Sequence, residues 1–243
     1  MRILFLGNSL IFFNRLPEML EQLMRAAGRA AEVHSVTKGS ATISDFTDPE
    51  TAVGAKALPL LSAEHWDYVI LEPSRRITPF EATVKEAELA SAMKLREIVL
   101  RAGGEVLLYS VWGNDNGAVH EFHAETPISV QRVATHPMDR MAHTAFLQRT
   151  NAEFSAALGG VPVAEAGYAF ENLLAAYPEL DPYHADRRHP SPIGTYLTAC
   201  VIYETIFAES VKPIPFAADL PEAERLKEIA DATVLGGRIP TLA

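Results

Sequence analysis

The sequence has a single cysteine among 243 residues, no run of more than two basic residues and no long apolar stretch. Lone Cys200 excludes an intrachain disulfide and a metal site made of several cysteines, and we expect it to be buried and inert. The net charge of −10 and the lack of a basic stripe argue against nucleic acid or an anionic membrane surface as a partner. Without roughly 20 consecutive apolar residues, the sequence predicts no membrane-spanning helix.

The composition is otherwise that of a globular protein, with 48% hydrophobic and 21% charged residues and no repeat or low-complexity tract. An α/β chain of about 200–250 residues often forms one domain, so we expect residues 1–243 to form a single domain. Met1–Gly7 has one basic residue before a short apolar run, which is typical of a first strand rather than a signal peptide. We therefore expect a cytoplasmic protein.

Short apolar runs alternate with longer helical patterns along the chain. Near-continuous apolar runs are typical of strands that helices cover on both faces. The predicted strands are Ile3–Leu6, Ala31–Val36, Tyr68–Leu71, Glu105–Val111 and Val161–Ala164. The predicted helices are Leu16–Ala27, Pro49–Ser62, Glu81–Ala102, Asp139–Leu158, Ala169–Ala176, Pro192–Ala208 and Pro221–Ala232. Because strands separated by helices are joined by right-handed crossovers, we expect an α/β fold with a parallel sheet between helix layers.

Local signals mark several boundaries. Gly28 and Gly103 follow predicted helices as C-terminal caps would, and Ser191 followed by Pro192 is typical of an N-cap and a first helical residue. The segment 113–138 does not fit the pattern, because it carries three of the eight histidines and has little periodicity. Loops of this length often line or cover a site, although a plain surface excursion explains the segment equally well.

The first strand runs directly into Gly7-Asn8-Ser9. In an open parallel sheet, ligands bind at the carboxyl ends of the strands. Gly7 allows the backbone to turn sharply, and the Ser9 hydroxyl is then placed to attack a bound substrate. A serine at this position is otherwise a turn or N-cap residue, so the motif alone decides little.

A second feature, Asp186-Arg187-Arg188-His189, lies near the C-terminus. A serine nucleophile needs a base within hydrogen-bond reach, and histidine is the side chain best suited to that role at neutral pH. An acidic residue then fixes the histidine tautomer, and Asp186 is placed to do so. Alternatively, Asp186 caps a turn and His189 merely precedes a proline. We expect Arg187 and Arg188 to be solvated or to pair with acidic neighbours.

Together these motifs resemble the SGNH/GDSL hydrolases, in the variant whose first block is Gly-Asn-Ser. The first block is Phe5–Leu10 and the last is Asp186–Ala199, which contains His-Pro-Ser and is the more specific of the two. The blocks lie at opposite ends of the chain, so the resemblance spans nearly all of it. It implies a flavodoxin-like α/β/α sandwich with five parallel strands in the order 2-1-3-4-5. It also implies a catalytic triad of Ser9, Asp186 and His189, with the Ser9 hydroxyl within bonding reach of the imidazole.

The resemblance further implies three donors that stabilise the oxyanion of the reaction. The backbone N–H of Ser9 is the first, and Gly39 lies where the family has a glycine after strand two. The third should be an asparagine after strand three, but Val69–Ser74 contains none. Ser74 and Asn114, which follows the fourth strand, are the candidates for this role.

Glu72 lies where a donor is expected, yet a carboxylate cannot donate a hydrogen bond and would repel an oxyanion. It therefore points away, is protonated, or binds a polar group of the substrate or of Arg75. We take Asn8, Glu72 and Trp112 as candidate substrate contacts, although core packing also explains Trp112. The motif His120-Glu121-Phe122-His123 has one residue too few between its histidines for a zinc site, and no metal is expected.

These expectations define a serine esterase that needs no cofactor and acts on a small-molecule or carbohydrate ester, such as an O-acetyl group. The oligomeric state stays open. One alternative is a non-catalytic carbohydrate- or ligand-binding member of the same fold, which the missing asparagine would suit. A flavin- or nucleotide-binding protein is the other, but one glycine and two phenylalanines in the first turn do not suit a phosphate cradle.

Overall fold

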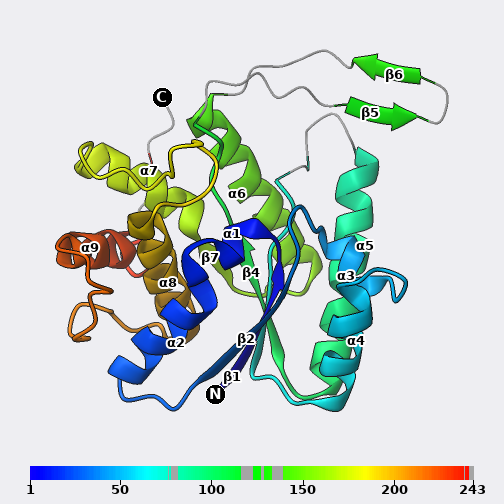
Figure 1. Cartoon of the computed structure of the whole chain (residues 1–243), viewed down its shortest axis with the longest axis horizontal. Coiled ribbons are helices and arrows are strands. Elements are labelled where there is room, and N and C mark those ends of the chain that lie inside the picture. The colour runs from blue at the N-terminus through cyan, green and yellow to red at the C-terminus, as the bar shows by residue number, and fades with distance from the viewer. Residues whose placement is uncertain are drawn as a thin grey trace.

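Five parallel strands form the central sheet of the computed structural model, in the order β2-β1-β3-β4-β7 (Figure 1). They are β1 (Arg2–Gly7), β2 (Glu32–Thr37), β3 (Tyr68–Leu71), β4 (Glu105–Ser110) and β7 (Val163–Glu165). The α/β fold and the 2-1-3-4-5 order are therefore confirmed. The structure describes residues 1–75, 77, 82–115, 123–126, 129–132, 139–237 and 239–240. Within 113–138, β5 (His123–Thr126) and β6 (Ser129–Arg132) form a separate antiparallel pair.

The predicted helices are present, with ends within three residues of the expected ones except at α4, which begins five residues late. The helices are α1 (Ser9–Phe12), α2 (Leu16–Ala26), α3 (Ile43–Thr47), α4 (Gly54–Ala63), α5 (Ala82–Arg101), α6 (Arg140–Ala157), α7 (Ala166–Ala176), α8 (Pro192–Phe207) and α9 (Ala223–Val234), with a 3₁₀ turn over Phe13–Arg15. The short helices α1 and α3 were not predicted. In the part of the chain that is described, no helix is long and apolar enough to cross a membrane.

Successive side chains of each strand enter two different cores, one on each face of the sheet. Ile3 and Phe5 of β1 pack in the cluster that contains α2, α7, α8 and α9. Leu4 and Leu6 pack on the opposite face with α3, α4 and α5. Figure 1 shows these two groups of helices on opposite sides of the sheet. Because both faces are covered, the strands are apolar at nearly every position.

The boundary signals act as expected. Gly28 and Gly103 adopt φ values of +75° and +81° directly after helices α2 and α5. The Ser191 hydroxyl accepts the Gly194 N–H at 3.3 Å, and Pro192 is the first residue of α8. These local signals are therefore confirmed as caps.

The register of the sheet brings the loops after four strands to one edge. Gly7 pairs with Thr37, Leu6 with Leu71, and Leu71 with Leu108. The segments that follow β1, β2, β3 and β4 therefore begin at the same level. All candidate site residues before 116 lie in these segments.

A buried glutamate lies beside a partly exposed aspartate where α9 packs on the end of α8. The side chain of Glu204 is fully buried, and its Oε1 accepts the Val211 N–H at 3.0 Å. Asp231 accepts hydrogen bonds from the Ser210 hydroxyl and pairs with Lys212 Nζ at 2.8 Å. Burial, with the Asp231 carboxyl adding to it, raises the pKa of Glu204 from 4.5 to about 9. Glu204 is therefore mainly protonated at neutral pH.

Glu204→Gln tests this protonation. Because the folded-state pKa is raised, Glu204 contributes most to stability below about pH 4.5, and this contribution is lost as pH rises towards 9. Glutamine stays neutral at every pH, so we expect the variant to have a higher melting temperature than the parent at pH 8.5 and a similar one at pH 5. Each kcal/mol by which the unfolding free energy rises should raise the melting temperature by roughly 2–4 °C. Thermal denaturation at both pH values measures this, with Glu86→Gln on the exposed face of α5 as the control. An equal difference at both pH values would contradict it.

Candidate active site

The Ser9 hydroxyl lies at the start of α1, directly beyond β1. Asn8 is the N-cap, and its Oδ1 accepts the Leu10 N–H at 3.1 Å. Ser9 Oγ lies 2.9 Å from His189 Nε2. Gly7 is required here for close approach, since a Cβ would lie 2.4 Å from Ile11 Cδ1 and 2.7 Å from a carboxylate oxygen of the strand β3 loop. The structure therefore brings together the two chain ends that the motifs place in one site.

His189 is oriented by Asp186, three residues earlier. His189 Nδ1 lies 2.6 Å from Asp186 Oδ2, and Asp186 Oδ1 accepts the backbone N–H groups of Arg188 and His189 at 3.0 and 2.9 Å. Burial opposes ionisation of Asp186, but these hydrogen bonds outweigh it and hold the pKa of the carboxyl well below its usual value. A carboxylate at this position favours the tautomer with a proton on Nδ1, which leaves Nε2 to accept the Ser9 proton.

The turn that carries this pair is folded back on itself. Tyr183 and Pro190 form an antiparallel bridge, and the His184 N–H donates to the carbonyl of His189 at 2.8 Å. Arg187 adopts a φ of +55°, a left-handed conformation that costs a non-glycine residue about 1 kcal/mol or more. The surrounding contacts must therefore hold the turn in place.

Asn14 provides one such contact from the segment after Ser9. Its side-chain amide donates to the carbonyl of Pro190 at 2.8 Å and to the Thr195 hydroxyl at 3.0 Å. Asn14 itself has a φ of +54°, a conformation that asparagine tolerates better than most residues. The ring of Phe13 stacks on His189 at a centroid distance of 4.5 Å. Sequence reasoning missed both residues.

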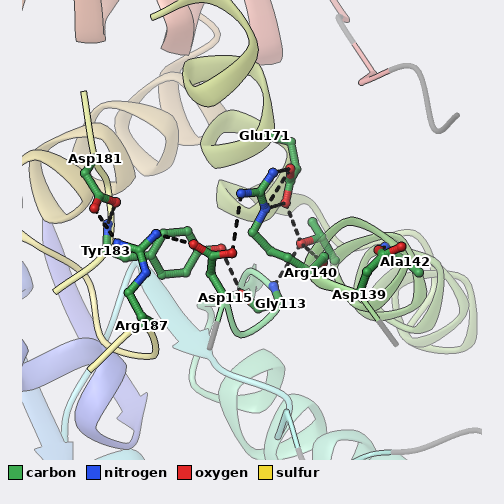
Figure 2. Close-up of polar contacts among 10 residues, drawn as sticks. Gly113, Asp115, Asp139, Arg140, Ala142, Glu171, Asp181, Tyr183 and Arg187 are labelled. Carbon is green, nitrogen blue, oxygen red and sulfur yellow. Dashed lines mark hydrogen bonds and ion pairs between the residues drawn. The ribbon is translucent and has the colours of Figure 1, made fainter. Parts of the chain in front are cut away.

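A network of alternating charges holds the turn from the other side (Figure 2). The Arg187 guanidinium pairs with both Asp181 and Asp115. Asp115 also faces Arg140 at 3.7 Å, and Arg140 donates to both carboxylate oxygens of Glu171, with the shortest contact at 2.9 Å. The network therefore joins the turn to the loop after β4 and to helices α6 and α7. The expectation that Arg187 pairs with acidic neighbours is confirmed.

Trp112 supports the turn from inside the core. Its Nε1 donates to the carbonyl of Arg188 at 3.1 Å, and its ring stacks on Phe170 at 3.8 Å. Arg75 Nη1 reaches the same carbonyl at 3.2 Å. The side chain of Trp112 has no exposed surface, which favours the alternative of core packing over a substrate contact.

Glu72 points at Asn8. The carboxylate is 1% exposed, and it accepts Asn8 Nδ2 at 2.8 Å on Oε1 and the Asn8 backbone N–H at 3.2 Å on Oε2. Burial raises the pKa of Glu72 to about 7, while the Asn8 hydrogen bonds and the Arg75 charge oppose the increase. Asn8 Nδ2 also donates to the carbonyl of Ala41 at 3.3 Å. Both side chains bind the protein itself, and their role as substrate contacts stays a prediction.

Two backbone donors lie at the site. In the described part of the chain, the N–H groups of Ser9 and Gly39 donate to no acceptor. Each residue lies two positions beyond the paired Gly7 and Thr37, at the same edge of the sheet. They stay the predicted oxyanion donors.

The two candidates for the third donor differ in their surroundings. Asn114 Oδ1 accepts Arg75 Nη1 at 2.7 Å, which assigns its Nδ2 group to the opposite side of the amide. Ser74 is 4% exposed, and its backbone N–H donates to Glu88 Oε2 at 3.4 Å. We therefore favour Asn114 as the third oxyanion donor, because Arg75 orients its amide and its side chain is less buried than that of Ser74.

Two other sequence features remain, the motif at 120–123 and Cys200. The side chains of the motif at 120–123 lie outside the described residues. Among the residues that are described, no group of three or more His, Cys, Asp or Glu could hold a metal ion. Cys200 is buried, as expected, and burial raises the pKa of its thiol well above the usual value.

No protein-family model and no curated protein match the chain, but solved structures do. A protein proposed to be an SGNH hydrolase, from Slackia heliotrinireducens, is 28% identical with a TM-score of 0.65, over 85% of this chain and 98% of that one. A DUF4886 family protein from Bacteroides uniformis is 15% identical with a TM-score of 0.76, over 100% and 98%. An acetyl xylan esterase, AlAXEase, is 13% identical with a TM-score of 0.59, over 85% and 100%. The resemblance to the SGNH/GDSL hydrolases is confirmed.

Arg187→Gln should loosen the turn that carries His189. The variant is shorter, stays polar and loses the guanidinium with both ion pairs, so we expect the unfolding free energy to fall by about 1 kcal/mol or somewhat more. The exposed neighbour Arg188, changed to glutamine, is the control and should shift it by less than about 0.5 kcal/mol. Urea denaturation of Arg187→Gln, Asp115→Asn and the double variant measures the coupling, with Arg188→Gln measured beside them. Strictly additive losses would show that the Arg187–Asp115 contact is not stabilising.

Proposed function

We propose that this SGNH/GDSL-type hydrolase is a serine esterase in which Ser9, His189 and Asp186 form the catalytic triad. One observation carries the proposal: Ser9 Oγ lies 2.9 Å from His189 Nε2, while His189 Nδ1 lies 2.6 Å from Asp186 Oδ2. These are the contacts that an activated serine requires, in the order nucleophile, base and orienting carboxylate.

Attack of Ser9 Oγ on the acyl carbon forms a tetrahedral intermediate, and His189 Nε2 takes the serine proton. The Asp186 carboxylate stabilises the imidazolium that results. His189 then gives the proton to the leaving alcohol, and an acyl-enzyme remains. Water that His189 activates attacks this ester, releases the acid and restores Ser9.

In the tetrahedral intermediate, the carbonyl oxygen carries a negative charge. The N–H groups of Ser9 and Gly39 and the side-chain amide of Asn114 stabilise this charge by hydrogen bonds. The two N–H groups have no acceptor among the described residues, so they are available for a ligand. Donors that are fixed before the reaction stabilise the transition state without a reorganisation cost. Arg75 fixes the Asn114 amide in this way.

The substrates that we propose are short acyl esters, such as acetyl groups on carbohydrates. The acetyl xylan esterase among the structural neighbours supports this class, since its fold covers 85% of the chain. The alternative is a non-catalytic binding protein of the same fold, which would neither hydrolyse an ester nor react with a serine-directed probe.

Ser9→Ala tests the nucleophile. We expect hydrolysis of p-nitrophenyl acetate to fall at least ~10³-fold, because the triad acts as a unit, and a fluorophosphonate probe to stop labelling the protein. Ser62→Ala, on the exposed part of α4, is the control and should keep both properties. Thermal denaturation checks that the variants fold. A folded parent that neither hydrolyses the ester nor reacts with the probe would favour the binding protein.

Asn114→Ala tests the third donor. Loss of one oxyanion donor costs on the order of a hundredfold in kcat, and we expect this loss with little change in KM. Ser74→Ala is the matched comparison and should retain most of kcat. If Ser74→Ala loses activity and Asn114→Ala does not, the third donor is assigned to the wrong residue.

A further inference from the structure

The two carboxylate oxygens of Glu72 accept two hydrogen bonds from Asn8, one from its side chain and one from its backbone. Oε1 accepts Asn8 Nδ2 at 2.8 Å and Oε2 accepts the Asn8 N–H at 3.2 Å. In the described part of the chain, Glu72 accepts no other hydrogen bond and has no ion-pair partner within 4 Å. Each oxygen is therefore committed to one N–H of the same residue.

The contact is shielded from water. Glu72 is 1% exposed, and Gly7 allows it to approach because a Cβ there would lie 2.7 Å from Oε2. The other charged or titratable groups that act on it are Arg75, Glu88 and Tyr109. A buried acceptor that loses its donor is not rescued by solvent, so a mismatch here is costly.

Asn8 connects this carboxylate to the nucleophile. It precedes Ser9 in the chain, and its Oδ1 accepts the Leu10 N–H at 3.1 Å as the N-cap of α1. Glu72 therefore fixes the position of Asn8 through two hydrogen bonds, and Asn8 fixes the start of helix α1, whose first residue is Ser9. Glu72 acts through Asn8 as a positioning residue.

We propose that Asn8 and Glu72 are an interdependent positioning pair, in which the buried carboxylate requires an asparagine, and not an aspartate, before the nucleophilic serine. Its consequence for activity rests on the proposed esterase function. The chemistry of the two side chains supports the pairing, because a carboxylate only accepts hydrogen bonds and an amide offers both a donor and an acceptor.

The pairing has a distinctive mutational signature. N8D places two carboxyl groups against each other in a buried site, where they repel or must share a proton in place of the Asn8 hydrogen bond. E72Q leaves one amide NH₂ group facing a donor, because glutamine has a single acceptor for two N–H groups. In N8D/E72Q the new amide can donate to the new carboxylate while its oxygen accepts the backbone N–H at position 8. Two individually harmful changes should therefore compensate each other.

The experiment compares the parent, N8D, E72Q and N8D/E72Q on p-nitrophenyl acetate. Misplacement of a reacting group by about 1 Å costs roughly a hundredfold, so we expect each single variant to lose about 10- to 100-fold in kcat with KM little changed. The double variant should recover most of the kcat that N8D loses, at least about threefold. Rescue is incomplete, because Asn8 Nδ2 also donates to the carbonyl of Ala41 and an aspartate would face that oxygen.

N8D/E88Q is the matched control. Glu88 is also buried at this edge of the sheet, but it accepts the N–H groups of Ile43 and Ser74 and does not contact Asn8. Removal of its charge should therefore not rescue N8D. Equal rescue by E88Q and E72Q would show a general charge effect and overturn the pairing.

Thermal midpoints of the same variants, without substrate, separate this proposal from the proposed function. N8D/E72Q should melt above N8D whether or not the protein is an esterase. A parent without Ser9-dependent hydrolysis overturns the proposed function alone. A double variant that is no better than N8D in kcat and in thermal midpoint overturns the pairing, while the esterase would stand.

Discussion

One hydrogen bond, between residues 180 positions apart in the chain, sets the requirements for the rest of the structure. Ser9 Oγ and His189 Nε2 must meet, although one belongs to the first residue of α1 and the other to the turn before α8. The parallel sheet places the first group at the edge where the strands end. The second group depends on the Asn14 amide, the Trp112 indole and the Arg187 ion pairs, which hold a turn with an unfavourable backbone conformation.

Buried carboxylates hold the loops at this edge of the sheet, because these loops lie beyond the last hydrogen bonds between the strands. Glu88 accepts backbone N–H groups of Ile43 and Ser74, from the segments after β2 and β3. Glu171 binds Arg140 at the start of α6, and Glu72 binds Asn8. Each carboxylate is compensated by N–H donors or by a guanidinium, as a buried charge must be. These buried acidic side chains therefore stabilise the loops as hydrogen-bond acceptors and ion-pair partners.

The fold could be predicted from the sequence because its signals are local. Apolar runs marked the five strands, and caps such as Ser191 marked helix ends. The short helices α1 and α3 were missed because four or five residues carry too little periodicity to be recognised. The resemblance of the two end blocks predicted which groups meet, and the structure brings Ser9, His189 and Asp186 within hydrogen-bond distance.

The remainder of the site depends on contacts between distant segments. Glu72 and Asn8 are 64 positions apart, and only the strand register makes them neighbours. Arg187 and Asp115 are 72 apart, so the sequence predicted an acidic partner but not which one. Trp112 was open to two interpretations, because a strand-end residue can face a cleft or the core. Such choices are decided by packing, which the sequence pattern does not encode.

The charge network that holds the His189 turn also has a consequence for how this protein can diverge. Asp115 and Arg140 flank the segment 116–138, and both are fastened to elements that do not belong to it. Each junction is therefore held by contacts with residues outside the segment. Because both ends of the segment are held at fixed points, we expect changes in its length or composition to leave the Ser9–His189 contact in place.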